Sequence, residues 1–498
     1  MASRPERTML APGLEISRIV TGLWQVADIE RKSGLIDPDH GSEALSAYAA
    51  AGFDTFDMAD HYGSAEVLTG RLLERIRAGS LPDTKPRAFT KWCPAPGGMS
   101  ADIVREGIRT SLDRMQTDRI DLMQFHWWMY EHPGYLDALI EMAKLREEGL
   151  FRHIGLTNFN ADHLHMLCAH GLPIVANQVS FSLIDRRAAG DLSRVAMRHG
   201  VRLLAYGTLG GGFLSERWLG RPEPAHGDIP DWSKSKYKRF INEIGGWPAL
   251  QAILAAASAI ARKHHVSIPN VATRWVLEQP AVAAVIVGAR LGENEHRADN
   301  LRVFDFALDA EDHARLDAAF AQTRNPPGDC GDEYRKPPFL TASGDLSHHL
   351  EGFPKIYAAE PVPFRSDGLR VSTGSLWEPI AGYSRAMRVG NQITISGTTA
   401  THGAGLPVAP GCAAAQTTYI LDKIAASLSA AGARLEDVVR TRIYLTNADE
   451  WEGVSRVHGH YFGHIRPANT LLEVSRLIGE GYRVEIEADA VTGTRDPA

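Results

Sequence analysis

The sequence predicts an α/β protein in which a closed (β/α)8 TIM barrel is followed by a smaller α+β unit. Between about residues 17 and 325, short β-rich apolar runs alternate eight times with segments of helical spacing, and the alternation then stops. Strands joined through helices favour parallel pairing with right-handed crossovers. A chain of 498 residues is also too long for one ordinary core, so we expect the remainder to fold separately.

Eight runs are expected as the strands of the first unit. They are ISRIVTGLW, FDTFDMA, RAFTKW, IDLMQFHW, FRHIGLTN, IVANQVS, RLLAYG and AAVIVGAR. Helical spacing between them is illustrated by Leu136, Leu139, Ile140 and Ala143, and Ser100 is a candidate N-cap. A doubly wound dinucleotide fold would place GxGxxG after its first strand, whereas here that strand runs into GLWQVAD. The barrel is therefore the favoured architecture, over residues 1–328.

Residues 329–375 are rich in Pro, Gly and Asp with little periodicity, and we interpret them as a linker. The second domain is expected over residues 376–498. There SRAMRV and QITISG flank Gly390-Asn391, a pair typical of a hairpin turn. A helix with Ile420, Ile424 and Leu428 on one face follows, then VVRTRIYL, the helical WEGVSRVHGHYFG, and the strands ANTLLEV and RVEIEADAV. The order ββαβαββ indicates a small α+β domain.

The composition narrows the class of protein. Hydrophobic residues make up 44% and charged residues 23%, as in soluble globular chains, and the net charge of −7 without a long basic run argues against a nucleic-acid partner. We expect a cytoplasmic protein with no membrane contact, because neither a signal peptide nor an apolar stretch long enough for a span is visible. Four scattered cysteines without a CxxC pair indicate reduced thiols. The histidines of HGHYFGH have no fixed carboxylate or cysteine beside them, so no metal is predicted.

Polar groups stand where the predicted strands end, which is where barrel enzymes place catalytic residues. In strand order they are Asp57 and then Tyr62, Lys91, His126, Thr157 with Asn158, Gln178, Tyr206, and Gly288 with Arg290. We expect these groups to line one site.

The first four of these groups suit the reduction of a carbonyl, which needs a hydride at carbon and a proton at oxygen. A tyrosine with its ordinary pKa near 10 is a poor acid at neutral pH unless a cation lies beside it. Lys91 would supply that cation, Asp57 would hold the ammonium, and His126 would orient the carbonyl. Asn158 and Gln178 suit the two ends of a nicotinamide amide, and the ring of Tyr206 can stack on the nicotinamide.

The blocks FDMADHYGSAE, AFTKW, LMQFHW, RHIGLTNF, ANQVSFS, LLAYGTLGGG and VIVGAR resemble, in order, those of the aldo-keto reductases over residues 15–325. The resemblance implies an NAD(P)H-dependent oxidoreductase with Asp57, Tyr62, Lys91 and His126 as its catalytic residues. It also implies NADPH, with NADH as the alternative, lying across the barrel mouth with its 2′-phosphate end near Arg290, His296, Asp299 and Asn300. Thr157, Leu209 and Gly211 are further candidates for cofactor contacts, and glycines 210–212 could cradle a pyrophosphate or form a plain loop.

The C-terminal blocks GYSRAMRVGNQITISGTTA, RPANTLLEVSRL and VEIEADAV resemble the RidA (reactive-intermediate deaminase) family. This implies a chorismate-mutase-like fold and a trimer with clefts between subunits, lined by Tyr383, Asn469, Thr470 and Glu487. The active deaminases carry Arg where this chain has Asn469, and an amide cannot replace a guanidinium that grips a carboxylate. The domain is therefore expected to trimerise or to bind a small ligand.

Three functions stay open at this point. The first is a fusion that reduces an aldehyde, a ketone or an imine. The second is a non-catalytic NADPH-binding sensor, and the third is a protein whose main activity is a C-terminal 2-imino acid deaminase. Four aromatic residues beside the site are candidates for the walls of a substrate pocket and are equally compatible with packing at the barrel rim: Trp92, Trp127, Trp128 and Tyr130.

Overall fold

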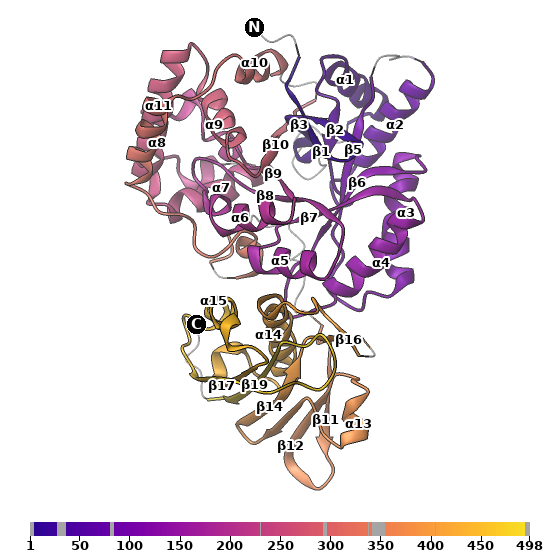
Figure 1. The fold of residues 1–498 in the computed structure, drawn as a ribbon. Helices are drawn as coiled ribbons and strands as arrows, with labels where there is room; N and C mark the ends of the chain where they lie inside the picture. The colour runs from indigo at the N-terminus through magenta and orange to yellow at the C-terminus, as the bar shows by residue number, and fades with distance from the viewer. Residues whose placement is uncertain are drawn as a thin grey trace.

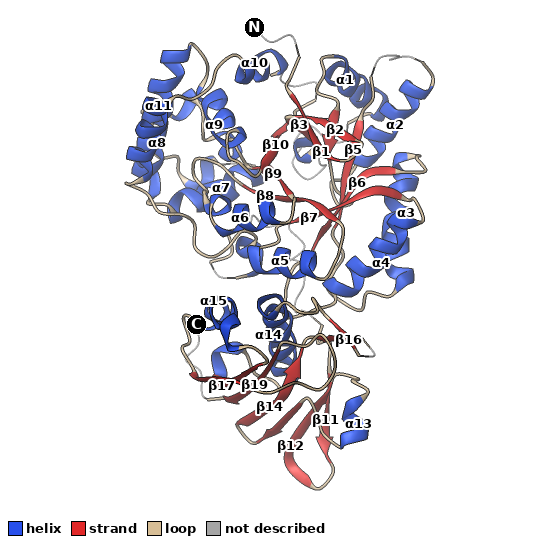
Figure 2. Cartoon of the chain, in the orientation of Figure 1, coloured by secondary structure: helices blue, strands red, loops and turns tan. Residues whose placement is uncertain are grey.

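The computed structural model describes residues 4–26, 36–79, 84–229, 231–291, 296–336, 338–340, 354–403 and 405–493. Two units follow one another along the chain, an α/β barrel and a smaller α+β domain, and they lie against each other (Figure 1, Figure 2). Among these residues no single helix is long and apolar enough to span a membrane. Two consecutive helices, residues 232–243 and 246–264, have the length and composition of a span only when they are taken together, and they are bent by 98° relative to each other.

Eight parallel strands close the barrel, which confirms the predicted fold class. They are β3 (Ile19–Gly22), β4 (Thr55–Asp57), β5 (Arg87–Trp92), β6 (Ile120–His126), β7 (Phe151–Thr157), β8 (Ile174–Ser180), β9 (Arg202–Tyr206) and β10 (Val282–Gly288). Sequential strands are neighbours, and β10 pairs with β3 to complete the ring. These strands carry Val, Ile, Leu and Phe on both faces because one face packs inside the barrel and the other packs under helices.

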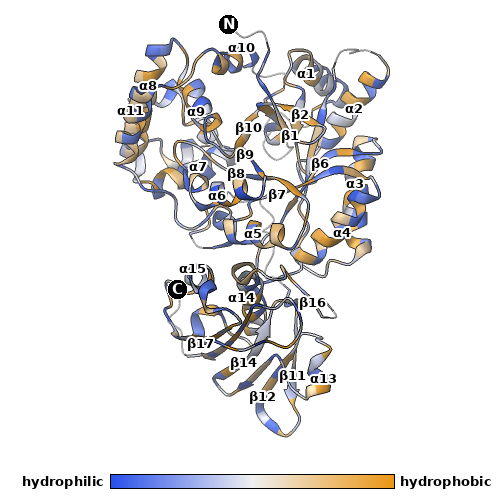
Figure 3. Ribbon diagram, in the orientation of Figure 1, coloured by the Kyte–Doolittle hydropathy of each residue, from blue (hydrophilic) through white to orange (hydrophobic). Residues whose placement is uncertain are grey.

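Helices surround the barrel with their apolar sides inward, and hydrophilic and hydrophobic residues alternate along them (Figure 3). They are α1 (Pro38–Ala50), α2 (Ala65–Arg77), α3 (Ala101–Met115), α4 (Tyr135–Glu147), α5 (Ala161–Ala169), α6 (Asp191–Arg198), α7 (Trp232–Glu243), α8 (Gly246–His264), α9 (Ile268–Leu277), α10 (Arg297–Leu301) and α11 (Ala310–Phe320). Ser100 caps α3 as predicted, with its hydroxyl accepting a hydrogen bond from the Ile103 backbone N–H at 3.4 Å.

A hairpin at the start of the chain seals one end of the barrel. It consists of β1 (Arg7–Ala11) and β2 (Leu14–Ser17). Its side chains Leu14 and Ile16 are buried in one apolar cluster with Val20, Phe89 and Leu122 from the barrel strands. Because this cluster fills the amino-terminal end of the barrel, that end is closed to a ligand.

The second unit is a sheet of seven strands in the order β11-β12-β13-β14-β19-β17-β18. The strands are β11 (Ala358–Val362), β12 (Arg365–Ser372), β13 (Ala386–Val389), β14 (Gln392–Thr399), β17 (Val438–Leu445), β18 (Ala468–Glu473) and β19 (Val484–Val491); β15 (Thr401–His402) and β16 (Leu406–Pro407) form a separate small pair. Helices α14 (Ala413–Ala430) and α15 (Trp451–Phe462) follow in the predicted positions, and α13 (Trp377–Ala381) is an additional short helix. Helix α14 is buried almost all round because it lies between its own sheet and α5 of the barrel (Figure 1).

The expected linker over residues 329–375 is too long at both ends. Residues 358–372 form β11 and β12, which extend the sheet of the second unit. At the other end, α12 (Asp332–Arg335) packs on the mouth of the barrel, where Asp332, Glu333 and Tyr334 are buried. Periodicity could not reveal β11, because four of its five residues are exposed and the strand therefore has no hydrophobic alternation.

Candidate active site

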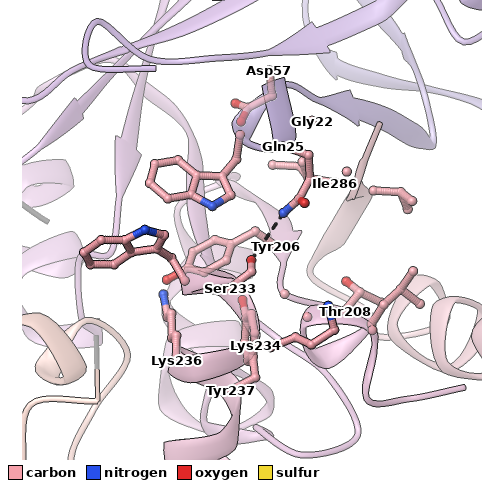
Figure 4. Close-up of a pocket in the computed structure, with 18 of the residues that line it drawn as sticks. Gly22, Gln25, Asp57, Tyr206, Thr208, Ser233, Lys234, Lys236, Tyr237 and Ile286 are labelled. Atoms are coloured by element: carbon pink, nitrogen blue, oxygen red, sulfur yellow. Dashed lines mark hydrogen bonds between the residues drawn. The ribbon is translucent and has the colours of Figure 1, made fainter. Parts of the chain in front are cut away.

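A cavity of about 580 Å³ lies at the carboxyl ends of the barrel strands (Figure 4). All fifteen barrel residues predicted from the sequence line it: Asp57, Tyr62, Lys91, His126, Thr157, Asn158, Gln178, Tyr206, Leu209, Gly211, Gly288, Arg290, His296, Asp299 and Asn300. Residues 243 positions apart along the chain therefore share one cavity, as the topology of a parallel barrel requires. A volume of this size is in the range of pockets that bind small organic molecules.

Asp57 and Lys91 form a buried ion pair on the floor of this cavity. Each is 3% exposed, and Lys91 Nζ donates to Asp57 Oδ2 at 2.7 Å and to the carbonyl oxygen of Met58 at 2.7 Å. The ammonium also lies 4.9 Å from the centre of the Tyr62 ring. The predicted triad of phenol, ammonium and carboxylate is thus assembled, and the carboxylate fixes the cation beside the tyrosine.

His126, at the end of β6, is held as a neutral imidazole. Burial lowers its pKa well below the usual value, and the nearby charges of Arg335, His61, Lys91 and Lys236 lower it further. Its Nε2 lies 3.3 Å from Asn158 Nδ2. A neutral ring in this position can orient a polar oxygen without adding a second positive charge next to Lys91.

The two amides predicted for the nicotinamide have protein partners as well. Gln178 Nε2 donates to Asp57 Oδ1 at 2.7 Å, and Gln124 Nε2, which the sequence analysis did not include, donates to the same oxygen at 2.9 Å. Asn158 Oδ1 accepts from the Tyr206 hydroxyl at 2.8 Å. Gln178 therefore supports the ion pair in addition to lining the cavity, while Asn158 and Tyr206 lie together on the cavity wall.

The opposite part of the cavity suits a phosphate-bearing cofactor. Gly211 has a left-handed φ of 63°, and a Cβ there would lie 2.9 Å from Tyr237 Cδ2, so only glycine leaves this wall undisturbed. Arg290 and His296 provide positive or hydrogen-bonding groups beside it. Asp299 also has a partner in the protein, because its carboxylate accepts a hydrogen bond from Ser267 Oγ at 3.0 Å at the start of α9. The residues present fit a nicotinamide dinucleotide, with amide and aromatic groups at one end and cationic groups at the other.

Several lining residues were missed by the sequence analysis. Trp24 packs edge-on against Tyr62 with ring centres 4.9 Å apart. Gln25 Nε2 donates to Ser233 Oγ at 3.3 Å and so bridges the cavity to the start of α7 (Figure 4). Tyr334 of α12 packs against His126, with ring centres 5.3 Å apart. Trp24 and Gln25 follow β3 closely, so their place after a strand was a signal in the sequence, whereas Tyr334 belongs to α12 and follows no strand.

One cluster of possible metal ligands lies beside the site. The ligand atoms of Asp60, His61 and Cys93 are within 4.8 Å of one another. Asp60 already accepts from the Cys93 backbone N–H at 2.9 Å and lies 2.9 Å from His61 Nδ1, so its carboxylate is used in fixing the loop after β4.

The structure separates the four residues predicted for the C-terminal cleft. Thr470 and Glu487 are both in register with Arg442 of β17 and share one face of the sheet, where Arg442 NH1 donates to Glu487 Oε2 at 3.3 Å. Asn469 is on the other face and donates to Thr441 Oγ1 at 2.9 Å. Tyr383 precedes β13 and accepts from Arg385 at 3.1 Å. Within this single chain, therefore, Asn469 and Glu487 do not converge.

Fold and site together define a barrel oxidoreductase that uses a nicotinamide cofactor. The family model described as the aldo/keto reductase family matches residues 18–321, and the chain belongs to that family. Its enzymes use NADPH or NADH, so the barrel is an NAD(P)H-dependent oxidoreductase. A second model, described as endoribonuclease L-PSP, matches residues 373–492 and confirms the RidA-like assignment of the second unit.

Three individual proteins show what the chain is similar to. The chain is 33% identical over 281 residues to protein tas of Escherichia coli, covering 49% of this chain and 79% of that protein. The glycerol dehydrogenase of Gluconobacter oxydans shares the barrel fold, with 22% identity, a TM-score of 0.52, and coverage of 66% of this chain and 98% of the other. Rv2704 of Mycobacterium tuberculosis, a member of the YjgF/YER057c/UK114 family, is 46% identical over 25% of this chain and 99% of its own, with a TM-score of 0.23.

Proposed function

We propose that the barrel reduces an aldehyde or ketone with Tyr62 as the general acid. The observation that carries this proposal is the ion pair of Lys91 and Asp57 beside the Tyr62 ring, at the floor of a cavity that also suits the cofactor. When bound, the reduced nicotinamide supplies the hydride that converts the carbonyl carbon to the carbinol carbon. The proton at the Tyr62 hydroxyl completes the alcohol, so NAD(P)H is oxidised and C=O is reduced.

The remaining side chains orient and enclose the carbonyl. Asp57 holds the Lys91 ammonium, which stabilises negative charge on the phenol as its proton leaves. Neutral His126 directs the carbonyl oxygen towards Tyr62. Trp24, Trp128 and Tyr334 line the cavity and keep water from the reacting atoms.

The test is NADPH oxidation by the full chain with a panel of aldehydes, ketones and cyclic imines. Tyr62→Phe should reduce kcat by about 10²- to 10⁴-fold and leave NADPH binding close to that of the parent. Tyr444→Phe, which removes a tyrosine hydroxyl from β17 of the second unit, is the matched control and should keep the parental kcat. Equal kcat in Tyr62→Phe and the parent would remove Tyr62 from its role, and no turnover of any substrate would favour the sensor.

For the second unit we propose assembly of three chains, or binding of a small ligand, rather than imine hydrolysis. Arg442, Glu487 and Asp489 form a row on the sheet face away from α14, with side chains 33%, 35% and 31% exposed, which another copy could cover. Light scattering on the full chain tests the assembly. Release of a 2-oxo acid from a 2-imino acid by the full chain would instead support deaminase activity, which the position of Asn469 argues against.

A further inference from the structure

Among the residues that the structure describes, three histidine–carboxylate pairs lie in the interface between the two units. His163 Nε2 lies 2.9 Å from Asp422 Oδ2, His402 Nε2 lies 2.7 Å from Asp137 Oδ1, and His460 Nδ1 lies 2.5 Å from Asp162 Oδ2. In each pair one partner belongs to the barrel and the other to the C-terminal unit. The first pair differs from the others because both of its side chains are only 1% exposed.

Asp422, on α14, is the centre of a buried polar cluster. Besides His163, it accepts hydrogen bonds from the hydroxyls of Tyr135 at 2.5 Å and Tyr461 at 2.7 Å. On its other side, His163 Nδ1 faces Asn160 Oδ1 at 2.8 Å, an oxygen that also accepts from the His163 backbone N–H at 3.0 Å. One ring nitrogen of His163 faces Asn160 and the other faces Asp422, so the imidazole bridges Asp422 to the loop after β7.

Direct contacts continue from His163 to the active site. The ring of Tyr130 stacks on His163, with ring centres 3.3 Å apart and an interplanar angle of 11°. The guanidinium of Arg335 lies 4.2 Å from the centre of the Tyr130 ring. Arg335 in turn donates to the carbonyl oxygens of Asn158 at 2.7 Å and Trp127 at 2.6 Å.

The end of this series is the wall of the reductase cavity. Trp127 directly follows His126, and the Asn158 side chain contacts both His126 and Tyr206. Asn158 also has a left-handed φ of 61°, which is uncommon for a residue other than glycine and persists only where neighbours hold it. The two carbonyl bonds from Arg335 are such a restraint.

We infer that the C-terminal unit is a working part of the reductase, in which Asp422 acts through His163, Tyr130 and Arg335 to position Asn158 and His126. The role of His126 rests on the proposed function, whereas the effect on NADPH binding through Asn158 does not require turnover. Asp422 is thus a positioning residue that lies outside the barrel. This gives a physical reason for the two units to be packed together in one chain.

The test compares two variants that each remove one histidine–carboxylate pair from the interface. In Asp422→Asn, the carboxylate is replaced by an amide that offers an N–H donor and a weaker oxygen acceptor. The hydroxyls of Tyr135 and Tyr461 and the imidazole of His163 therefore lose part of their hydrogen bonding. His402→Gln removes the ion pair with Asp137 on α4, and within the described part of the chain neither of these two side chains hydrogen-bonds or stacks with Tyr130 or Arg335. NADPH affinity, measured by quenching of tryptophan fluorescence, should fall on the order of 2- to 30-fold in Asp422→Asn and stay at the parental value in His402→Gln. With a substrate from the panel, kcat should fall in the same variant.

Parental NADPH affinity in Asp422→Asn would overturn the inference, and so would equal losses in both variants, since docking alone would then explain them. If the parent binds NADPH but reduces no substrate, the proposed function fails while the affinity comparison still decides this inference. Should Asp422→Asn not fold, Tyr130→Leu interrupts the series in the middle and leaves the pair of Asp422 and His163 in place. It should weaken NADPH binding in the same way, and parental affinity there would equally overturn the inference.

Discussion

Replacing Lys91 by methionine tests the buried ion pair at the centre of the site. Methionine is similar in length but removes the ammonium that donates to Asp57 Oδ2. The carboxylate is 3% exposed, and leaving a buried charge without its partner typically costs about 3–5 kcal/mol. Asp57 Oδ1 keeps the amide donors Gln124 and Gln178, so we expect a loss of free energy of unfolding near the lower limit, about 3 kcal/mol.

A double-mutant cycle separates this pairing from simple loss of packing. Urea unfolding is measured for Lys91→Met, Asp57→Asn and the variant carrying both changes. In the double variant no unpaired charge remains, so it should be more stable than the sum of the single losses predicts, by about 2 kcal/mol. If the stability losses of the two single variants sum to that of the double variant within about 0.5 kcal/mol, the assignment of a coupled pair is refuted. In kinetics, the pH profile of Lys91→Met should move to higher pH, because the cation that favours the phenolate is gone, and an unmoved profile would contradict that coupling.

Three further outcomes are expected. Burial lowers the pKa of His165 to about 4, so between pH 6.5 and 4 the unfolded chain binds a proton that the folded chain does not. The stability of the protein therefore falls as the pH falls through this range. The thermal unfolding temperature of His165→Gln should depend less on pH there than that of the parent. Glu333→Gln removes one of the buried partners of Arg187, which keeps its bidentate contact with Asp185, and limited proteolysis should cut more readily near residue 333. Gly211→Ala forces a side chain against Tyr237 from a left-handed φ, and the KM for NADPH should rise several-fold with normal thermal stability of the second unit.

The barrel and its site could be predicted from the sequence because one rule connects them. Parallel strands in a closed barrel end on the same rim, so a polar residue after each apolar run is placed in the cavity without further information. This holds for residues as distant as Asp57 and Arg290, whereas Asn300 was expected in the cavity from the resemblance to the aldo-keto reductases. The hydrogen-bond partners of these groups could not be predicted by the same rule. Gln178 was assigned to the cofactor by its chemistry, but its bond to Asp57 depends on side-chain direction inside the barrel, which a local pattern does not contain.

The C-terminal site shows a signal that was present in the sequence and was not used. Successive residues of a strand point to opposite faces, so within one chain Asn469 and Thr470 are expected on different faces of the sheet. The structure places Thr470 with Glu487 and Asn469 with Thr441. The composition of β11 gave no comparable signal, because this exposed edge strand lacks the alternation that identifies a strand.

Residues 329–336 show why composition misleads at a domain boundary. Glycine, proline and aspartate usually indicate a solvated linker, yet here Glu333 is fully buried against Arg187, with the carboxylate 3.0 Å from the guanidinium. A buried charge pair of this kind fixes a segment in one position, since moving either partner would leave a charge unpaired in the interior. The segment then presents Tyr334 to the catalytic cavity on one side and Arg335 to Tyr130 on the other. A stretch that connects two domains in the sequence is therefore, in the folded chain, a shared wall of the active site and of the domain interface.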